Sequence, residues 1–244
     1  MWFWWSIGLT ISTLSGIFIV KKHRDAGLPI LMTLFAGYVL SANILVPRIA
    51  SVNLGFGEMI LTTGSIIWPF TAQILDMINE VYGRKKAYLA VFGAFLINVL
   101  FITFVFLGNS LTAQWDSESE AFWSRYFETA PRILLASWVT FLLAHSLDIV
   151  MFSRLKEFFR EKHEETNVKN IILFCTTRSM TSDLANMILD GMLFATLAFA
   201  FVVPVETLWS LITGSIATKA FLAFLDTPWY IAFRLGIRHS IRES

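Results

Sequence analysis

The sequence has 244 residues, of which 56% are hydrophobic and 15% are charged, and its mean hydropathy is +0.64. Soluble domains carry about 25% charged residues, so this composition excludes an ordinary soluble domain and indicates an all-α polytopic membrane protein. The formal net charge of +1 gives no reason to expect nucleic acid as a partner. The single cysteine, Cys175, excludes an intrachain disulfide and a multi-cysteine zinc site.

Seven stretches approach the about 20 apolar residues that a transmembrane helix needs. The first residues lack the basic start of a signal peptide and contain four aromatic side chains, which favours a retained, interface-anchored span. We therefore expect an extra N-terminal helix over 1–27, a six-helix transporter core over 28–239 and a tail over 240–244. The predicted spans are 3–20, 28–49, 56–81, 87–107, 133–152, 183–203 and 206–233.

Basic residues alternate between the two sides of these spans. They gather after the first, third, fifth and seventh stretches, whereas the loops between carry Arg48, Arg125 and Arg132. Cytoplasmic loops are enriched in Lys and Arg. The pattern predicts a multi-pass protein of the cell membrane with its N-terminus and the 108–132 loop outside and its C-terminus in the cytoplasm.

The segment before the sixth span is the least regular part of the sequence. Residues 170–203 exceed the length that a bilayer requires, and the run CTTRSMTSD in its middle is a poor helix former. This predicts a tilted, kinked or broken helix, or a short interfacial helix leading into the span. A cytoplasmic loop over 170–182 is the alternative.

The stretch 62–86 carries the most informative polar pattern. Pro69, Gln73, Asp76 and Glu80 share one face of a helix with about 3.6 residues per turn. A charge inside the bilayer costs about 3 kcal/mol on insertion scales, so this face should line a cavity or meet a partner. The flanking rings of Trp68 and Phe70 are candidates for stacking on a flat ligand.

Other polar residues inside the spans complete the candidate site. Asp190 and Lys219 fall near the middle of their spans, where opposite charges are expected to pair and to line or brace a cavity. The substrate-binding candidates are Asn43, Trp68, Phe70, Gln73, Asp76, Glu80, Asp148, Asn186, Asp190 and Lys219.

Several of these residues also have a structural interpretation. Glu80 and Asp226 lie near span ends, where Arg84, Lys85 or Arg234 can pair with them at the interface. His145 lies one turn before Asp148, which favours a hydrogen bond between them. Asn43 precedes Pro47 and can satisfy backbone groups at a helix irregularity, and Arg178 can be an ordinary residue of the cytoplasmic surface.

The six spans after the first divide into two triplets whose middle members carry similar polar faces. Pro69, Gln73, Asp76 and Glu80 in one correspond to Ser179, Asp183, Asn186 and Asp190 in the other, which suggests a 3+3 inverted repeat. The sequence contains no G-x-S-x-G elbow, no H-E-x-x-H helix and no P-loop. We therefore expect neither catalysis nor a cofactor.

Five segments together resemble the queuosine precursor transporter family, also called the vitamin uptake transporter family. They cover about residues 40–235, and the run Pro-x6-Asp-x3-Glu-x-Tyr-Gly-Arg-Lys from Pro69 is their most specific part. The resemblance implies uptake of 7-cyano-7-deazaguanine or its 7-aminomethyl relative for tRNA modification. The segments are SANILVPRI (41–49), TTGSIIWPFTAQILDMINEVYGRKKA (62–87), LAHSLDIVMFSRLK (143–156), TRSMTSDLANMILDGMLFATLAF (177–199) and TKAFLAFLDTPWY (218–230).

The implied substrate fits an acid-rich pocket. A deazaguanine presents N1–H and an exocyclic amine as adjacent donors, and one carboxylate can accept both. Two modes of import stay open: a stand-alone carrier working by alternating access, or a membrane subunit that binds substrate for a separate ATPase. The sequence leaves open the choice between cyano and aminomethyl substrates, the energy source and whether the protein is a homodimer.

Overall fold

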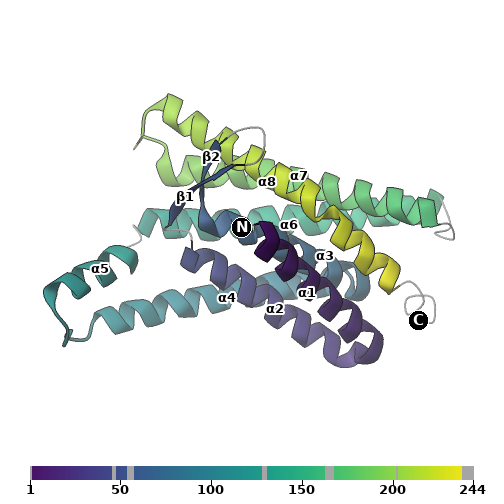
Figure 1. Ribbon diagram of the computed structural model, residues 1–244, viewed down its shortest axis with the longest axis horizontal. Helices are drawn as coiled ribbons and strands as arrows, with labels where there is room; N and C mark the ends of the chain where they lie inside the picture. Colours follow the sequence, from purple (N-terminus) through teal and green to yellow (C-terminus); the bar gives the residue numbers. More distant parts are fainter. Residues whose placement is uncertain are drawn as a thin grey trace.

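The computed structural model describes residues 2–45, 48–53, 58–127, 131–162, 168–201 and 203–237 (Figure 1). These residues form long helices, a short antiparallel hairpin in which Ile49 pairs with Thr62, and one 3-10 turn. The elements are α1 (Trp2–Lys22), α2 (Arg24–Leu45), β1 (Ile49–Asn53), β2 (Glu58–Thr62), η1 (Thr63–Ile67), α3 (Trp68–Tyr82), α4 (Arg84–Asn109), α5 (Ser117–Phe127), α6 (Pro131–Lys162), α7 (Val168–Phe199) and α8 (Val205–Gly236).

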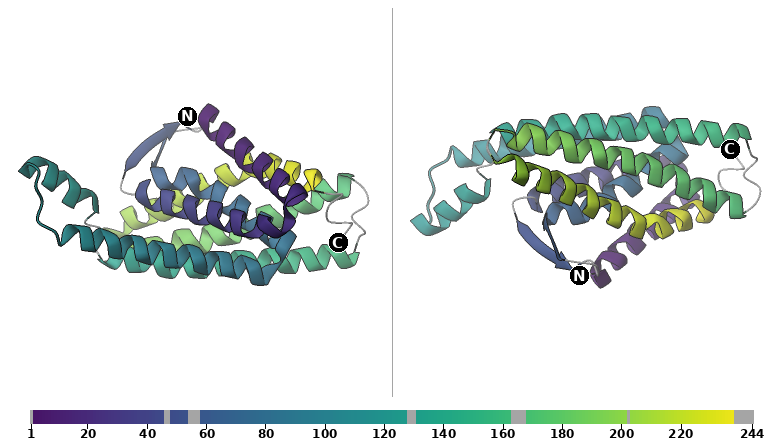
Figure 2. Two further views of the ribbon diagram at one scale, coloured as in Figure 1. Left: turned by 90° about the horizontal axis from the view of Figure 1, so that it is seen from below. Right: turned by 90° about the horizontal axis from the view of Figure 1, so that it is seen from above.

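The helices form a bundle from which α5 projects at one end (Figures 1 and 2). Among the described residues, α1, α2, α4, α6, α7 and α8 are long and apolar enough to cross a membrane. Their outward faces carry large apolar side chains such as Phe104, Leu143 and Leu184, which suit lipid. The expectation of an all-α membrane protein holds for the bundle, with the addition of the β1–β2 hairpin.

The predicted third span, 56–81, is corrected by the structure. Its first part forms β2 and η1, and α3 has only 15 residues, about 22 Å at 1.5 Å per residue, which is less than a bilayer's hydrocarbon core. Nearly every side chain from Trp68 to Glu80 is buried, so its apolar content reflects contact with other helices rather than with lipid. Seven spans are therefore not confirmed.

The expectation of a broken helix or loop around residues 170–182 is wrong. The described part of α7 is one continuous helix that begins at Val168, and α6 and α8 are equally long at 32 residues. Threonine and serine in the run CTTRSMTSD lower helix propensity only slightly. Packing of α7 between α6 and α8 overrides that preference (Figure 2).

The first helix packs closely against the core helices. A Cβ at Gly16 would lie only 2.8 Å from Sδ of Met77 in α3, so the glycine permits this close approach. Gln73 Nε2 donates to Thr13 Oγ1 at 2.8 Å, and Trp229 Nε1 donates to Thr10 Oγ1 at 3.0 Å. Helix α1 thereby supplies a polar partner to α3. The boundary at residue 27 between an extra N-terminal helix and a six-helix transporter core stays a prediction.

Candidate functional site

Four buried aspartates from four helices lie near one another inside the bundle. We call Asp76 on α3, Asp148 on α6, Asp183 on α7 and Asp226 on α8 the aspartate cluster. Each is at most 5% exposed, and the other three carboxylates all interact electrostatically with Asp76. Within the described residues, none forms a salt bridge with a cation. The described part of the chain also lacks a grouping that can hold a metal ion.

One serine hydroxyl joins two members of the cluster. Ser179 Oγ lies 2.9 Å from Asp76 Oδ2 and 3.1 Å from Asp183 Oδ2. The spacing of Ser179 and Asp183 by one helical turn on α7 aims both side chains at α3. We call this contact the Asp76–Ser179–Asp183 bridge.

Polar atoms around the bridge have unused hydrogen-bonding capacity. Asn186 is fully buried, and among the described residues neither its Nδ2 nor its Oδ1 has a hydrogen-bond partner. Asn186 lies on the same face of α7 as Ser179 and Asp183. Oε1 of Gln73 and Oδ1 of Asp183 likewise have no hydrogen-bond partner within the described part of the chain. Such groups are costly unless a ligand, a proton or water satisfies them.

Glu80, one turn after Asp76, has a very different environment. Its side chain is 1% exposed, and its carboxylate lies 2.9 Å from Arg234 Nε, 3.3 Å from Arg178 Nη2 and 3.4 Å from Lys156 Nζ. The predicted pairing with Arg234 is confirmed, but it is buried inside the bundle rather than placed at the interface. The interpretation of Arg178 as a surface residue is wrong, because its exposure is 0%. This cation network joins α3 to α6, α7 and α8.

Asp190 and Lys219 form the ion pair that their positions predict. Lys219 Nζ donates to Asp190 Oδ2, which joins α7 to α8. The Asp190 side chain is 24% exposed, so its carboxylate is less buried than that of Glu80, whose side chain is 1% exposed. The predicted hydrogen bond between His145 and Asp148 is absent from the described structure, where Nδ1 of His145 and both oxygens of Asp148 lack such a partner.

The other candidates lie to the sides of the cluster. Asn43 Nδ2 donates to Asn98 Oδ1 at 2.5 Å, so its partner is another side chain rather than the backbone. Phe70 faces the opposite way from the acids, with its ring 6.1 Å from that of Trp5 and 5.5 Å from that of Tyr38. Trp68 packs against Met187 of α7 and Ala223 of α8. Of the two aromatic residues, Trp68 therefore lies on the side of α7 and α8.

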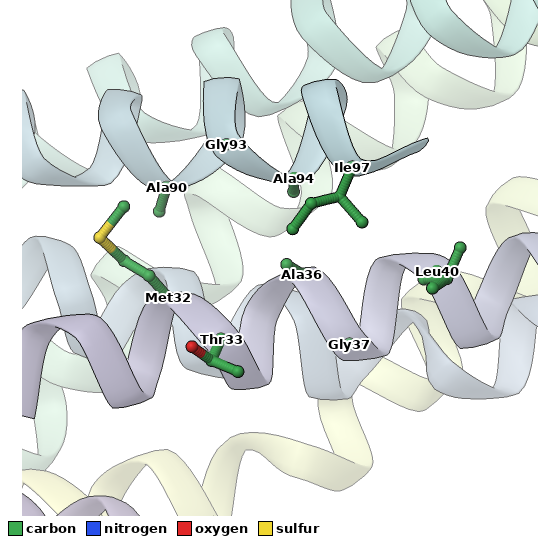
Figure 3. A pocket seen from close by; sticks show the side chains of 9 residues that line it. All are labelled: Met32, Thr33, Ala36, Gly37, Leu40, Ala90, Gly93, Ala94 and Ile97. Atoms are coloured by element: carbon green, nitrogen blue, oxygen red, sulfur yellow. The ribbon is translucent and has the colours of Figure 1, made fainter. Parts of the chain in front are cut away.

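Two cavities lie away from the aspartate cluster. A groove of about 360 Å³ between α2 and α4 is lined by small and apolar residues with Thr33 as its one polar side chain (Figure 3). A second cavity, beside Asn43 and Asn98, has about 20 Å³, which is room for about one water molecule. Neither offers charged groups to a purine-like base. A solute of that size could reach the aspartate cluster only if the surrounding helices separated.

The structure brings Asp76 and Asp148 together in the aspartate cluster and places Asn186 one turn from Asp183 on α7. It directs Gln73 toward α1 and separates Asn43 and Phe70 from the cluster. The candidate list from the sequence omitted Ser179 and Asp183, although both belong to the polar face that suggested the repeat. The signal that identifies them is their one-turn spacing on that face. Arg178 gave no such signal, because its role depends on how α7 packs against α3.

Buried acids and amides inside a membrane bundle are typical of polytopic proteins that move polar solutes across membranes. A family model described as "Putative vitamin uptake transporter" matches residues 62–233. The chain belongs to this family. It is also 23% identical over 184 residues to the "Probable queuosine precursor transporter" of Bacillus subtilis (strain 168), a match that covers 75% of this chain and 76% of that protein. No solved structure matches the chain.

Proposed function

We propose that this protein imports 7-cyano-7-deazaguanine or 7-aminomethyl-7-deazaguanine, precursors for tRNA modification, by alternating access. The observation that carries the proposal is the aspartate cluster with Asn186 beside it. This region offers buried acceptors and a donor amide that have no hydrogen-bond partner among the described residues. The similarity to a protein named as a queuosine precursor transporter supports this choice among small polar solutes.

Asp76 is the residue that we assign to the donor edge of the base. Its carboxylate can accept N1–H and the exocyclic amine together, and charge-assisted pairs of this kind are strong away from water. We assign the O6 acceptor to Asn186, whose Nδ2 has no hydrogen-bond partner among the described residues. Trp68, which packs against Met187 and Ala223, is the aromatic residue that we assign to the flat face. Asp148 belongs to the same buried cluster and is the carboxyl group that we assign to the cationic aminomethyl group when the aminomethyl base is bound.

We assign a bracing role to the charged pairs. The Glu80 network ties α3 to α6, α7 and α8 at the end of α3 that precedes the basic run beginning at Arg84. In our proposal this end faces the cytoplasm, the N-terminus lies outside, and the network must loosen when the site opens inward. A cysteine at Lys85 should resist an impermeant thiol reagent in intact cells, and one at exposed Ser117 should react, in a Cys175→Ser background. The reverse pattern would invert this orientation.

Uptake by the protein reconstituted alone tests the proposal. Proteoliposomes should accumulate labelled 7-cyano-7-deazaguanine, guanine should compete, and adenine should not, because adenine places an acceptor at N1 where guanine has a donor. Leaving the polar groups of such a site unpaired costs a factor on the order of 10⁴ in discrimination. Absence of uptake together with tight binding would favour the alternative, a subunit that needs an ATPase. Equal competition by adenine would contradict reading of the donor edge.

A further inference from the structure

The Asp76–Ser179–Asp183 bridge contains one hydrogen fewer than its two contacts require. A serine hydroxyl donates a single hydrogen, yet Ser179 Oγ is within hydrogen-bond distance of a carboxylate oxygen on either side. If both carboxylates were ionised, one contact would place two lone pairs against each other. The geometry is satisfied when one carboxyl carries a proton and donates it to Ser179 Oγ while the hydroxyl donates to the other.

The charges around the bridge give the same answer. Asp148 on α6 and Asp226 on α8 face it with further carboxyl groups, and both interact electrostatically with Asp183. The cations that are buried inside the described bundle have other partners: Lys219 bonds Asp190, and Arg178 and Arg234 pair with Glu80. His145 on α6 interacts electrostatically with the Asp190–Lys219 pair instead. A buried carboxylate without a cation takes up a proton to avoid the cost of an unpaired charge.

An independent feature points to a second occupant at the same place. Asn186 is fully buried one turn beyond Asp183, and its side-chain amide makes no hydrogen bond with any described residue. A region that holds a proton on one carboxyl and leaves an amide open beside it can receive a proton and a polar solute together.

We propose that the Asp76–Ser179–Asp183 bridge is a proton-binding site that couples entry of the base to entry of a proton. This inference rests on the proposed function. A proton from the outer water forms an O–H bond with a carboxyl oxygen of Asp183, and the Asp76 carboxylate stays charged and accepts the two donors of the base. After the helices open toward the cytoplasm, that O–H bond breaks and water there takes up the proton as the base departs.

The direct test of the site uses the purified protein without substrate. Infrared difference spectra between acidic and alkaline buffer should contain the C=O stretch of a protonated carboxyl group. The band should be missing from Asp183→Asn and shifted in Ser179→Ala, which loses the bridging hydroxyl. The matched control Asp25→Asn, with the same chemical change at an exposed position, should retain it. A spectrum of Asp183→Asn that is identical to that of wild type would overturn the proposal.

The coupling test uses proteoliposomes with an imposed pH gradient. With one proton per base, a gradient of one pH unit, inside alkaline, supports up to about tenfold accumulation. Asp183→Asn, which imitates the neutral carboxyl permanently, should lose the gradient-driven accumulation, whereas the exposed control Asp25→Asn should keep it. Wild-type uptake that ignores the gradient would overturn the coupling while leaving the proposed substrate intact. A pH-dependent Asp183 band in a protein that transports no deazaguanine would support the proton site and reject the proposed function.

Discussion

Asp76 and Glu80 are one helical turn apart on α3, yet they have opposite surroundings. Glu80 is surrounded by Arg178, Arg234 and Lys156 from three other helices, whereas Asp76 meets Ser179 and further carboxyl groups. Both residues are buried: as whole residues, Asp76 is 2% exposed and Glu80 is 5% exposed. The difference is that cations neutralise the charge of Glu80, whereas no cation among the described residues pairs with Asp76. A compensated charge fixes helices together, and an uncompensated one stays available for a proton or a ligand.

The largest expected effect is on stability when Glu80 is changed. Glu80→Gln removes the carboxylate from three cations, two of them buried, and breaking such a buried arrangement typically costs about 3–5 kcal/mol. Chemical denaturation in mixed micelles measures the loss. The matched control is Asp76→Asn, the same kind of change one turn earlier, which should lose much less. Equal losses in the two variants would mean that their environments do not differ as described.

A smaller effect is expected at the Asp190–Lys219 pair. Because the Asp190 side chain is 24% exposed, water can partly replace its partner. Asp190→Asn or Lys219→Met alone should cost about 1–3 kcal/mol, and the double variant should be more stable than the sum of the single losses predicts. A double-mutant cycle of unfolding free energies measures this coupling. Strictly additive losses would show that the two side chains do not interact in solution.

The smallest effect concerns the exposed helix α5 and its pH dependence. Asp116 Oδ1 accepts hydrogen bonds from the backbone N–H groups of Glu118 and Ser119, and Oδ2 accepts one from the Ser119 hydroxyl at 2.7 Å. The Ser119 hydroxyl and these backbone groups lower the pKa of the Asp116 carboxyl. A lowered pKa in the folded state means that the cap is fully present above the ordinary value, about 4. It is lost as the pH falls through the lowered value.

Amide hydrogen exchange over 117–127 should therefore speed up at the acid end and in Asp116→Ala at neutral pH. Glu157→Gln, an exposed carboxyl on α6, is the control and should leave α5 unchanged. Exchange over 117–127 that does not respond to the loss of Asp116 would remove its role as a cap.

Much of the long-helix architecture was predictable from local sequence. Apolar length placed six helices, and the midspan positions of Asp190 and Lys219 predicted their contact because an isolated charge there is costly. The 56–81 stretch was not predictable in this way, since an apolar run buried by protein has the same hydropathy as one buried by lipid. Only packing distinguishes them, and α3 is enclosed by α2, α4, α6 and α8.

The candidate site was partly predictable for the same reason. Helical periodicity placed Gln73, Asp76 and Glu80 on one face, and it grouped Ser179, Asp183 and Asn186 on another. Helical periodicity does not show which face of one helix packs against which face of another. The meeting of Asp76 with Ser179, and of Glu80 with Arg178, depends on how α3 and α7 cross. Such contacts between distant residues give no local signal in a single sequence.

The measurement that tests the central claim most directly is calorimetric binding of 7-cyano-7-deazaguanine to purified wild type and Asp76→Asn. Hydrogen bonds to a charged group contribute about 1.5–3 kcal/mol each. Asp76→Asn removes the negative charge and one of the two acceptor oxygens, so it should lose one such bond and weaken binding by about 10-fold or more, in a variant that stays folded under the assay conditions. Asn43→Ala, which changes a residue bonded to Asn98 away from the cluster, should bind as wild type does. Undiminished binding by Asp76→Asn, or a loss confined to Asn43→Ala, would contradict the assignment of the base to the aspartate cluster.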